Sequence, residues 1–267
     1  MARSLWSGSV SFGLVNVPVA LYSAARDLDV HFHQLHEPTK AGIEVRRVCS
    51  KENKEVDWED IAHGWDAGDG CVMVTDDELA ALEPRRTKTI DIERFVALAD
   101  IDPLHFDHPY FLVPAGGEGA ARAYALLAKV MDKSGRAAIG RFVLRTKEYL
   151  VALRVREGAI ALSTMLFADE IRSPDALGDA RPDGKKDKPT KRHVDQAVAL
   201  IEELSTDFDA SAYEDRHRKR LEALIRRKRK GEEIEAPGEP ETPEPVSDLM
   251  ASLRESLKAA RSGTLVG

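Results

Sequence analysis

Apolar and polar residues alternate near the N-terminus, in the stretch SLWSGSVSFGLVNVPVALYSA. The apolar residues first occupy even positions (Trp6, Val10, Phe12 and Leu14) and then odd ones (Val15, Val17, Val19 and Leu21). Alternation with a period of two is typical of a β-strand, and a change of face beside a glycine indicates a bulge or sharp bend, as at a barrel corner. We therefore expect a strand that bends just after Gly13, with Pro18 at a sheet edge or in the bulge itself.

Short runs with strand-like composition recur through the first two thirds of the chain. They cover residues 29–35, 43–48, 71–75, 89–98 and 108–114. Residues 137–166 read as three antiparallel strands, with turns near 146–148 and 157–158. Many short strands joined by tight turns predict an antiparallel barrel or sandwich with a few inserted helices.

Two helices are predicted among these strands. Thr75 and Glu78 have the spacing of a capping box, which predicts the start of a short helix over residues 75–83. Residues 115–135 read as a glycine-rich loop followed by a helix that ends at Gly135. The apolar stripe of this helix is expected to be Ala123, Leu126, Leu127 and Val130.

The last third of the chain is helical by pattern. After an exposed loop over 175–191, Thr190 caps a helix with the apolar face Val194, Ala197, Val198, Ile201 and Leu204. A second helix is expected from about Ser211 through residue 230, with the face Tyr213, His217, Leu221, Leu224 and Ile225. Residues 232–245 are rich in Pro and Glu, which predicts a disordered linker. Residues 246–262 are again helical by pattern, with the stripe Val246, Leu249, Met250, Leu253 and Leu257.

Charge is distributed unevenly. The whole chain carries a net charge of −7, yet nine of the fifteen residues in 216–230 are Lys or Arg. Six glutamates in the linker 232–245 account for most of the net negative charge, so the first 231 residues are close to neutral. Clustered bases on a nearly neutral body create a local positive field, because a nearby phosphate senses the cluster and not the distant sum.

Two cysteines, Cys49 and Cys71, form no CxxC pattern, which favours a reducing cytosol. The first residues lack the apolar core of a signal peptide, and no apolar run is long enough for a membrane span. We expect a cytoplasmic protein without a membrane partner.

Enzymatic chemistry finds little support in the residues. His31, His33 and His36 lie near Cys49 and could be ligands of a metal-dependent hydrolase, but no fourth ligand with standard spacing follows, so structural roles are favoured. The loop AGGEG (115–119) lacks the Lys and Ser or Thr of a phosphate loop. We expect no catalytic residue, no bound metal and no cofactor.

Basic residues are the stronger signal. On the hairpin 141–156, Arg141 and Arg145 are expected opposite the apolar Phe142 and Leu144. Further bases are Arg46, Arg47, Lys51, Lys54, Arg85, Arg86 and Lys88. An ordinary solvated sheet face would explain them, and so would a surface that binds phosphates.

Long stretches of the chain resemble the bacterial Ku family of DNA-end-binding proteins. Besides the N-terminal stretch, they include RRVCSKENKEVDWEDIAHGW (46–65), TIDIERFVALADIDPLHFDHPYFLVP (89–114), RFVLRTKEYLVALR (141–154) and DFDASAYEDRHRKRLEALI (207–225). The resemblance covers residues 1–230 in order. Many members of the family end in a Lys-rich extension that is not present here, so DNA contacts attributed to it are not expected.

The resemblance implies an α+β fold: an antiparallel β-barrel core with an inserted bridge and a helical C-terminal arm, in a ring-forming dimer. We expect the barrel core with its bridge in 1–190, the arm in 191–231, the linker in 232–245 and a terminal partner-binding helix and tail in 246–267. The function implied is sequence-independent binding of double-stranded DNA ends by a homodimer. It includes recruitment and stimulation of an ATP-dependent DNA ligase in the non-homologous end joining of double-strand breaks.

The resemblance also assigns roles to residues by their position. The DNA contacts expected from the bridge are Arg46, Arg47, Lys51 and Lys54, and those from the hairpin are Arg141, Arg145 and Lys147. The partner-binding residues are Val246, Leu249, Met250, Leu253 and Leu257. A general duplex-binding protein without preference for ends is the alternative, and it differs in lacking a closed ring.

Overall fold

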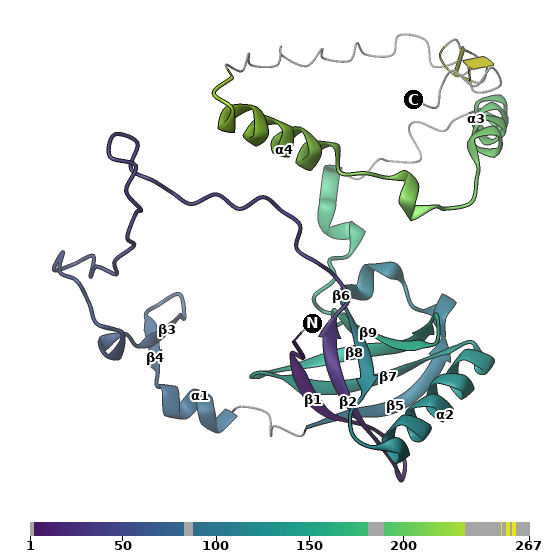
Figure 1. Ribbon diagram of the computed structural model, residues 1–267, viewed down its shortest axis with the longest axis horizontal. Helices are drawn as coiled ribbons and strands as arrows, with labels where there is room; N and C mark the ends of the chain where they lie inside the picture. The colour runs from purple at the N-terminus through teal and green to yellow at the C-terminus, as the bar shows by residue number, and fades with distance from the viewer. Residues whose placement is uncertain are drawn as a thin grey trace. The chain divides into compact units, whose positions relative to one another are not determined.

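The computed structural model describes residues 3–82, 88–180 and 190–232, together with Ser252, Glu255, Ser256, Lys258 and Ala259. The chain divides into two compact units, which are drawn in Figure 1. The first unit comprises Met1–Leu28 and His33–Ser173, and the second comprises Asp29–Phe32 and Pro174–Gly267.

A closed barrel of seven strands forms the core of the first unit. The strands are β1 (Trp6–Phe12), β2 (Val15–Ser23), β5 (Thr89–Ala97), β6 (Phe106–Pro114), β7 (Arg136–Leu144), β8 (Lys147–Arg156) and β9 (Ala159–Met165). Around the barrel their order is β1-β2-β6-β9-β8-β7-β5. Neighbouring strands are antiparallel except for β1 and β5, which close the barrel as a parallel pair. The expected barrel and its three strands over 137–166 are confirmed.

The predicted bend at Gly13 is a complete hairpin turn. Phe12 pairs with Val15, and Gly13 has the left-handed φ of 59° that a glycine adopts without strain. The turn therefore separates two strands, and each strand keeps its own alternation. The expectation of one bulged strand with Pro18 at an edge was wrong, because Pro18 pairs with Ser9 inside a closed barrel that has no edge.

Inward-pointing side chains fill the barrel. Val10, Val17, Val19 and Leu21 of the first hairpin are fully buried. They pack in one cluster with side chains from the other strands, including Ile90, Leu112, Phe142, Leu153, Ile160 and Leu162. Burying one such side chain contributes about 1.5–3 kcal/mol, so the alternation that is visible in the sequence is what closes the core.

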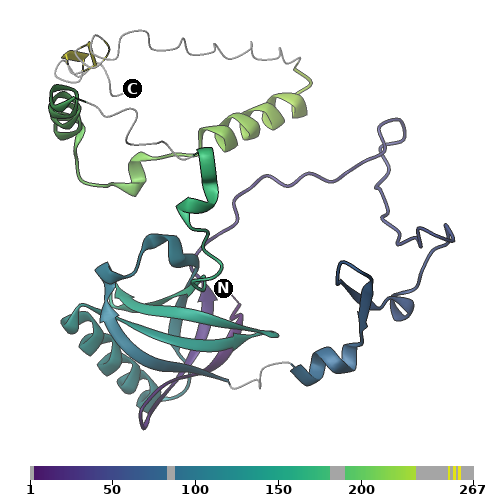
Figure 2. The same cartoon turned by 180° about the vertical axis from the view of Figure 1, so that it is seen from behind.

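Helix α2 (Glu118–Ser134) packs against the barrel (Figure 2). It adds Tyr124, Leu127 and Met131 to the barrel core. It ends at Gly135, as predicted, where φ is 63°. The predicted apolar stripe was partly wrong. Leu126 and Val130 are 65% and 57% exposed, because the barrel receives the neighbouring stripe of the same helix.

Residues 33–82, here named the bridge segment, lie between β2 and β5 in the chain. They contain a 3-10 turn η1 (Trp58–Asp60), the strand pair β3 (His63–Asp66) and β4 (Cys71–Val74), and helix α1 (Asp76–Leu82). The capping box is confirmed, since the Glu78 N–H donates to Thr75 Oγ1 and the Thr75 N–H donates to Glu78 Oε2. The strands predicted over 29–35 and 43–48 are wrong, since these residues form only single bridges at Leu35 and Val48.

The second unit is helical. It contains η4 (Pro174–Ala180), α3 (Lys191–Leu204), η5 (Ala210–Ala212) and α4 (Arg216–Arg229). The 3-10 turns η2 (Leu98–Asp100) and η3 (Pro103–His105) belong to the first unit. Thr190 caps α3 as predicted. Helix α4 begins later than the predicted Ser211, because Asp215 accepts the N–H of Arg218 and caps it. Among the described residues, no helix is long and apolar enough to cross a membrane.

Candidate nucleic-acid interface

A tight loop in the bridge segment gathers four of the predicted DNA contacts. Cys49 N–H donates to the Lys54 carbonyl at 2.9 Å, and Val56 N–H donates to the Arg47 carbonyl at 3.0 Å. Asn53 completes the turn with a φ of 54°, a conformation that asparagine tolerates better than most residues. The side chains of Arg46, Arg47, Lys51 and Lys54 are all exposed on this loop.

Two of these four cations are partnered by carboxylates. Arg46 lies 3.1 Å from Glu55 and 3.3 Å from Glu44, and Lys54 lies 4.0 Å from Glu52. Such exposed pairs contribute at most about 1 kcal/mol each, but they offset the positive charge that a phosphate would meet. Arg46 and Lys54 are therefore weaker phosphate ligands than their sequence positions suggested.

Arg47 has a different environment from its neighbour. Its guanidinium carbon lies 4.4 Å from the ring centre of Trp58, whose side chain is 70% exposed. Within the described residues, no carboxylate forms an ion pair with Arg47 or with Lys51. Trp58 was not among the predicted site residues. An exposed tryptophan a few positions after a basic run was the signal that could have indicated it.

The same loop affects the thiol of Cys49. The backbone N–H of Glu52, and to a smaller extent that of Lys51, stabilises the thiolate and lowers the pKa of Cys49 below its ordinary value. Cys49 is not in a disulfide.

The β7–β8 hairpin gathers the other three predicted DNA contacts. Leu144 pairs with Lys147, so Arg145 and Thr146 form the turn, and Arg145 is held at a φ of 61°. Few non-glycine residues adopt this conformation, and it costs about 1–2 kcal/mol. Arg145 is exposed in this turn at the hairpin tip. The turn lies slightly earlier than the predicted 146–148, because Lys147 and Glu148 already belong to β8.

Arg141 and Lys147 flank that tip. Arg141 points away from the buried Phe142, as predicted, and forms ion pairs with Glu93 at 3.1 Å and Glu148 at 3.3 Å. Lys147 lies 5.3 Å from the ring centre of Tyr149 and 3.9 Å from Glu170. The hairpin therefore presents one cation at a strained turn and two that are partly neutralised by carboxylates.

The basic helix α4 contributes a further set of cations. Arg227 Nε donates to Glu232 at 3.1 Å, so the first glutamate of the acidic linker already reaches a base of this helix. Lys219 is paired with Glu214, and Arg220 and Arg226 each donate to a carbonyl of the helix itself. The remaining linker residues lie outside the described part of the chain, as do Arg85, Arg86, Val246, Leu249, Met250, Leu253 and Leu257.

Metal chemistry gains no support from the described ranges. Among residues 3–82, 88–180 and 190–232, no three His, Cys, Asp or Glu side chains are arranged so that they could hold a metal ion. His36, one of the predicted alternatives, instead shares a hydrogen bond of 2.8 Å with Thr39.

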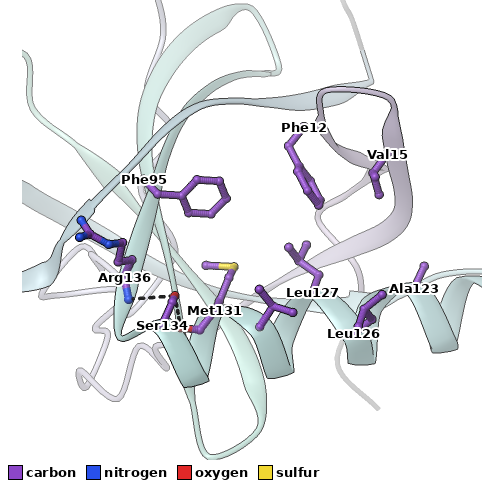
Figure 3. Close-up of a pocket in the computed structure, with 10 residues that line it drawn as sticks. Phe12, Val15, Phe95, Ala123, Leu126, Leu127, Met131, Ser134 and Arg136 are labelled. Atoms are coloured by element: carbon purple, nitrogen blue, oxygen red, sulfur yellow. Dashed lines mark hydrogen bonds between the residues drawn. The ribbon is translucent and has the colours of Figure 1, made fainter.

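An apolar groove lies between α2 and strands β1, β2 and β5 of the barrel (Figure 3). It has a volume of about 520 Å³. Phe12 and Phe95 form one wall, with ring centres 6.4 Å apart, and α2 forms the other. The residues that line it are Phe12, Val15, Phe95, Ala123, Leu126, Leu127, Val130, Met131, Ser134 and Arg136.

Comparisons with known proteins cover nearly the whole chain. Residues 11–196 match the family described as the Ku70/Ku80 beta-barrel domain. A protein of Anaeromyxobacter sp. (strain K) is 46% identical over 264 residues, which cover 98% of this chain and 87% of that protein. A protein of Mycobacterium tuberculosis (strain H37Rv) is 38% identical over 267 residues, which cover 96% of this chain and 95% of the relative. Both relatives carry the name "Non-homologous end joining protein Ku".

Proposed function

Because this chain belongs to the Ku family, we propose that it binds the ends of double-stranded DNA, without regard to sequence, in non-homologous end joining. The observation that carries the proposal is the pairing of a Ku barrel with two groups of exposed cations, one on the bridge segment and one at the β7–β8 tip. Such cations suit sugar–phosphate contacts, which carry no sequence information directly. No catalytic step and no cofactor belong to this proposal.

A homodimeric ring is the assembly that explains a preference for ends. A closed ring admits DNA only where a duplex terminates, and DNA can then slide through it. The cations of the bridge segment and the hairpin tip would face this channel. Residues 1–190 would supply the barrel and bridge of each subunit, and residues 191–231 the arm.

The terminal segment is the proposed contact with an ATP-dependent DNA ligase. The apolar residues Val246, Leu249, Met250, Leu253 and Leu257 recur at helical spacing beyond the acidic linker. A short amphipathic helix of this kind suits a groove on a partner protein. Deleting residues 246–267 should leave DNA binding intact and abolish stimulation of the ligase, whereas unchanged stimulation would reject this role.

A comparison of the affinities for linear and covalently closed DNA of the same sequence distinguishes end binding from general duplex binding. We expect linear duplexes of unrelated sequence to be bound alike in gel-shift titrations, and relaxed closed circles to be bound poorly. Cutting the circle once should restore binding. Equal affinity for the closed and the cut circle would reject the ring and favour a duplex-binding protein without end preference.

A further inference from the structure

The apolar groove on the barrel leaves large apolar side chains exposed to solvent. Leu126 and Val130 of α2 are more than half exposed, and Phe95 opposite them is 41% exposed. Contiguous apolar surface of this kind usually marks an interaction site. Its volume of about 520 Å³ lies within the ~300–1,000 Å³ that is typical of ligand pockets.

The groove has the shape of a helix-binding site. Its residues on α2 run from Ala123 to Ser134, which corresponds to a length of about 16 Å at the helical rise of ~1.5 Å per residue. The opposite wall, formed by Phe12, Val15 and Phe95, comes from β1, β2 and β5 of the barrel. About three turns of a partner helix can therefore lie along α2 with one apolar stripe between the two walls (Figure 3).

The border of the groove is basic. Arg122 and Lys133 are exposed, and they lie four residues before Leu126 and three residues after Val130 on the same helix, whereas Lys129 lines a separate pocket beside Asp132. Arg136 lines the end of the groove beyond Ser134. Arg122 is paired with Glu118 at 3.2 Å, which leaves Lys133 and Arg136 as the border cations without a carboxylate ion pair among the described residues. A partner with acidic flanks is complementary to this border.

We propose that this groove binds an amphipathic helix of a partner protein that has one aliphatic stripe flanked by acidic residues. The chemistry follows from the two walls and the border: aliphatic residues spaced i, i+4, i+7 and i+11 fill the groove, and carboxylates beside them meet Arg136, which lines the groove, and the neighbouring Lys133. The interaction uses neither basic cluster of the proposed DNA interface, so it stands whether or not the chain binds DNA.

Synthetic peptides titrated into the full chain test this proposal. The probe is a helical peptide with leucine at i, i+4, i+7 and i+11 and glutamate on both flanks. A matched peptide carries lysine in place of glutamate, and a third is this chain's own segment 246–262. We expect fluorescence anisotropy to show that the glutamate-flanked peptide binds, that it binds more weakly at high salt, and that the lysine-flanked peptide binds at least about tenfold more weakly.

Two variants of α2 assign the binding to the groove. Val130→Asp places a charge on the exposed wall and should weaken binding of the glutamate-flanked peptide about tenfold or more. Ala121→Asp adds the same charge at an exposed position of the same helix outside the groove and should leave binding unchanged. Melting curves check that both variants stay folded.

Four outcomes of the peptide titrations would overturn the proposal, and a fifth comes from sedimentation. The four are the absence of binding, equal binding of the glutamate- and lysine-flanked peptides, equal effects of Val130→Asp and Ala121→Asp, and tighter binding of the segment 246–262. The last of these would make the groove a dock for the chain's own terminal segment. Loss of self-association in Val130→Asp, measured by sedimentation, would instead assign the groove to a second copy of the chain.

Discussion

The guanidinium of Arg47 lies 4.4 Å from the ring centre of Trp58, whereas that of the adjacent Arg46 lies between Glu44 and Glu55. Stacking on an aromatic ring uses the face of a guanidinium and leaves the N–H donors at its edge free for a phosphate. Two neighbouring arginines in one predicted DNA-binding segment are therefore not equivalent, and the difference can be measured.

Arg47→Gln should weaken binding to linear duplex. It should also make the fall of log K with log[salt] shallower by about 0.9, the value for one phosphate contact. Trp58→Leu should weaken binding about two- to fivefold, because it removes the stacking that positions the guanidinium. The matched comparison is Arg46→Gln, which removes a cation whose charge Glu44 and Glu55 already offset and should change the slope less than Arg47→Gln does. A larger effect at Arg46 than at Arg47 would contradict this assignment.

Arg145 is strained at the tip of the β7–β8 hairpin, which suggests that its side chain has a function there. Arg145→Asn should raise the free energy of unfolding by about 0.5–1 kcal/mol, because asparagine tolerates the left-handed conformation. The same change should lower the salt slope of DNA binding by about 0.9. Glu157→Asn is the control, since Glu157 has a φ of 51° in the next hairpin turn and should gain stability without losing DNA affinity. Retained affinity in Arg145→Asn would remove Arg145 from the interface.

Cys49 should react as a thiolate at lower pH than an ordinary thiol, because the backbone N–H groups of Glu52 and Lys51 lower its pKa. In a Cys71→Ser chain, the rate of alkylation by iodoacetamide should therefore rise at lower pH in the folded protein than in urea. The associated stabilisation is present above the ordinary thiol pKa and is lost as the pH falls through the lowered one. Identical pH profiles with and without urea would show that the turn does not hold these N–H groups in solution.

Tyr124 joins α2 to the barrel through two hydrogen bonds. Its hydroxyl donates to the Leu112 carbonyl at 2.7 Å and accepts the Ile160 N–H at 2.8 Å, and burial raises the pKa of Tyr124. Tyr124→Phe should lower the free energy of unfolding by about 1–3 kcal/mol, because two buried backbone groups lose their partner. Tyr213→Phe, at a position 75% exposed, should change it little in the same urea titrations. An effect at Tyr124 no larger than at Tyr213 would mean that water replaces the lost hydroxyl.

The bases that end α4 give a further prediction. Changing Arg226, Arg227 and Arg229 together to Gln should weaken DNA binding modestly and lower the salt slope by about 1–2. Replacing the linker glutamates by Gln should strengthen binding at low salt, because Glu232 already competes for Arg227. If the arginine variant keeps both its affinity and its slope, these bases form a solvated helix end, where the helix dipole favours cations.

Local chemistry in the sequence determined much of the barrel. The alternation on either side of Gly13 and the turn-forming residues between β7, β8 and β9 predicted strands that bury every second side chain. The Thr75 capping box and the end of α2 at Gly135 were also readable, because a cap depends on residues only a few positions apart. Local spacing also predicted a turn between β7 and β8, although it placed the turn near 146–148 and the structure has it at Arg145 and Thr146.

Only the tertiary structure decided which helix stripe is buried, which segments pair as strands and which arginines are neutralised, because local sequence patterns fit each alternative equally well. Leu126 and Leu127 both suit an apolar stripe, and the barrel selected the stripe of Leu127, where Tyr124 also reaches backbone partners on two strands. Residues 43–48 have strand-like composition, yet within the described part of the chain they form only one isolated bridge, between Val48 and Glu55, because a strand needs a partner along its whole length. Arg46 and Arg47 are adjacent arginines that the sequence alone does not distinguish. The folded turn distinguishes them, because it brings Glu55 to Arg46 and Trp58 to Arg47.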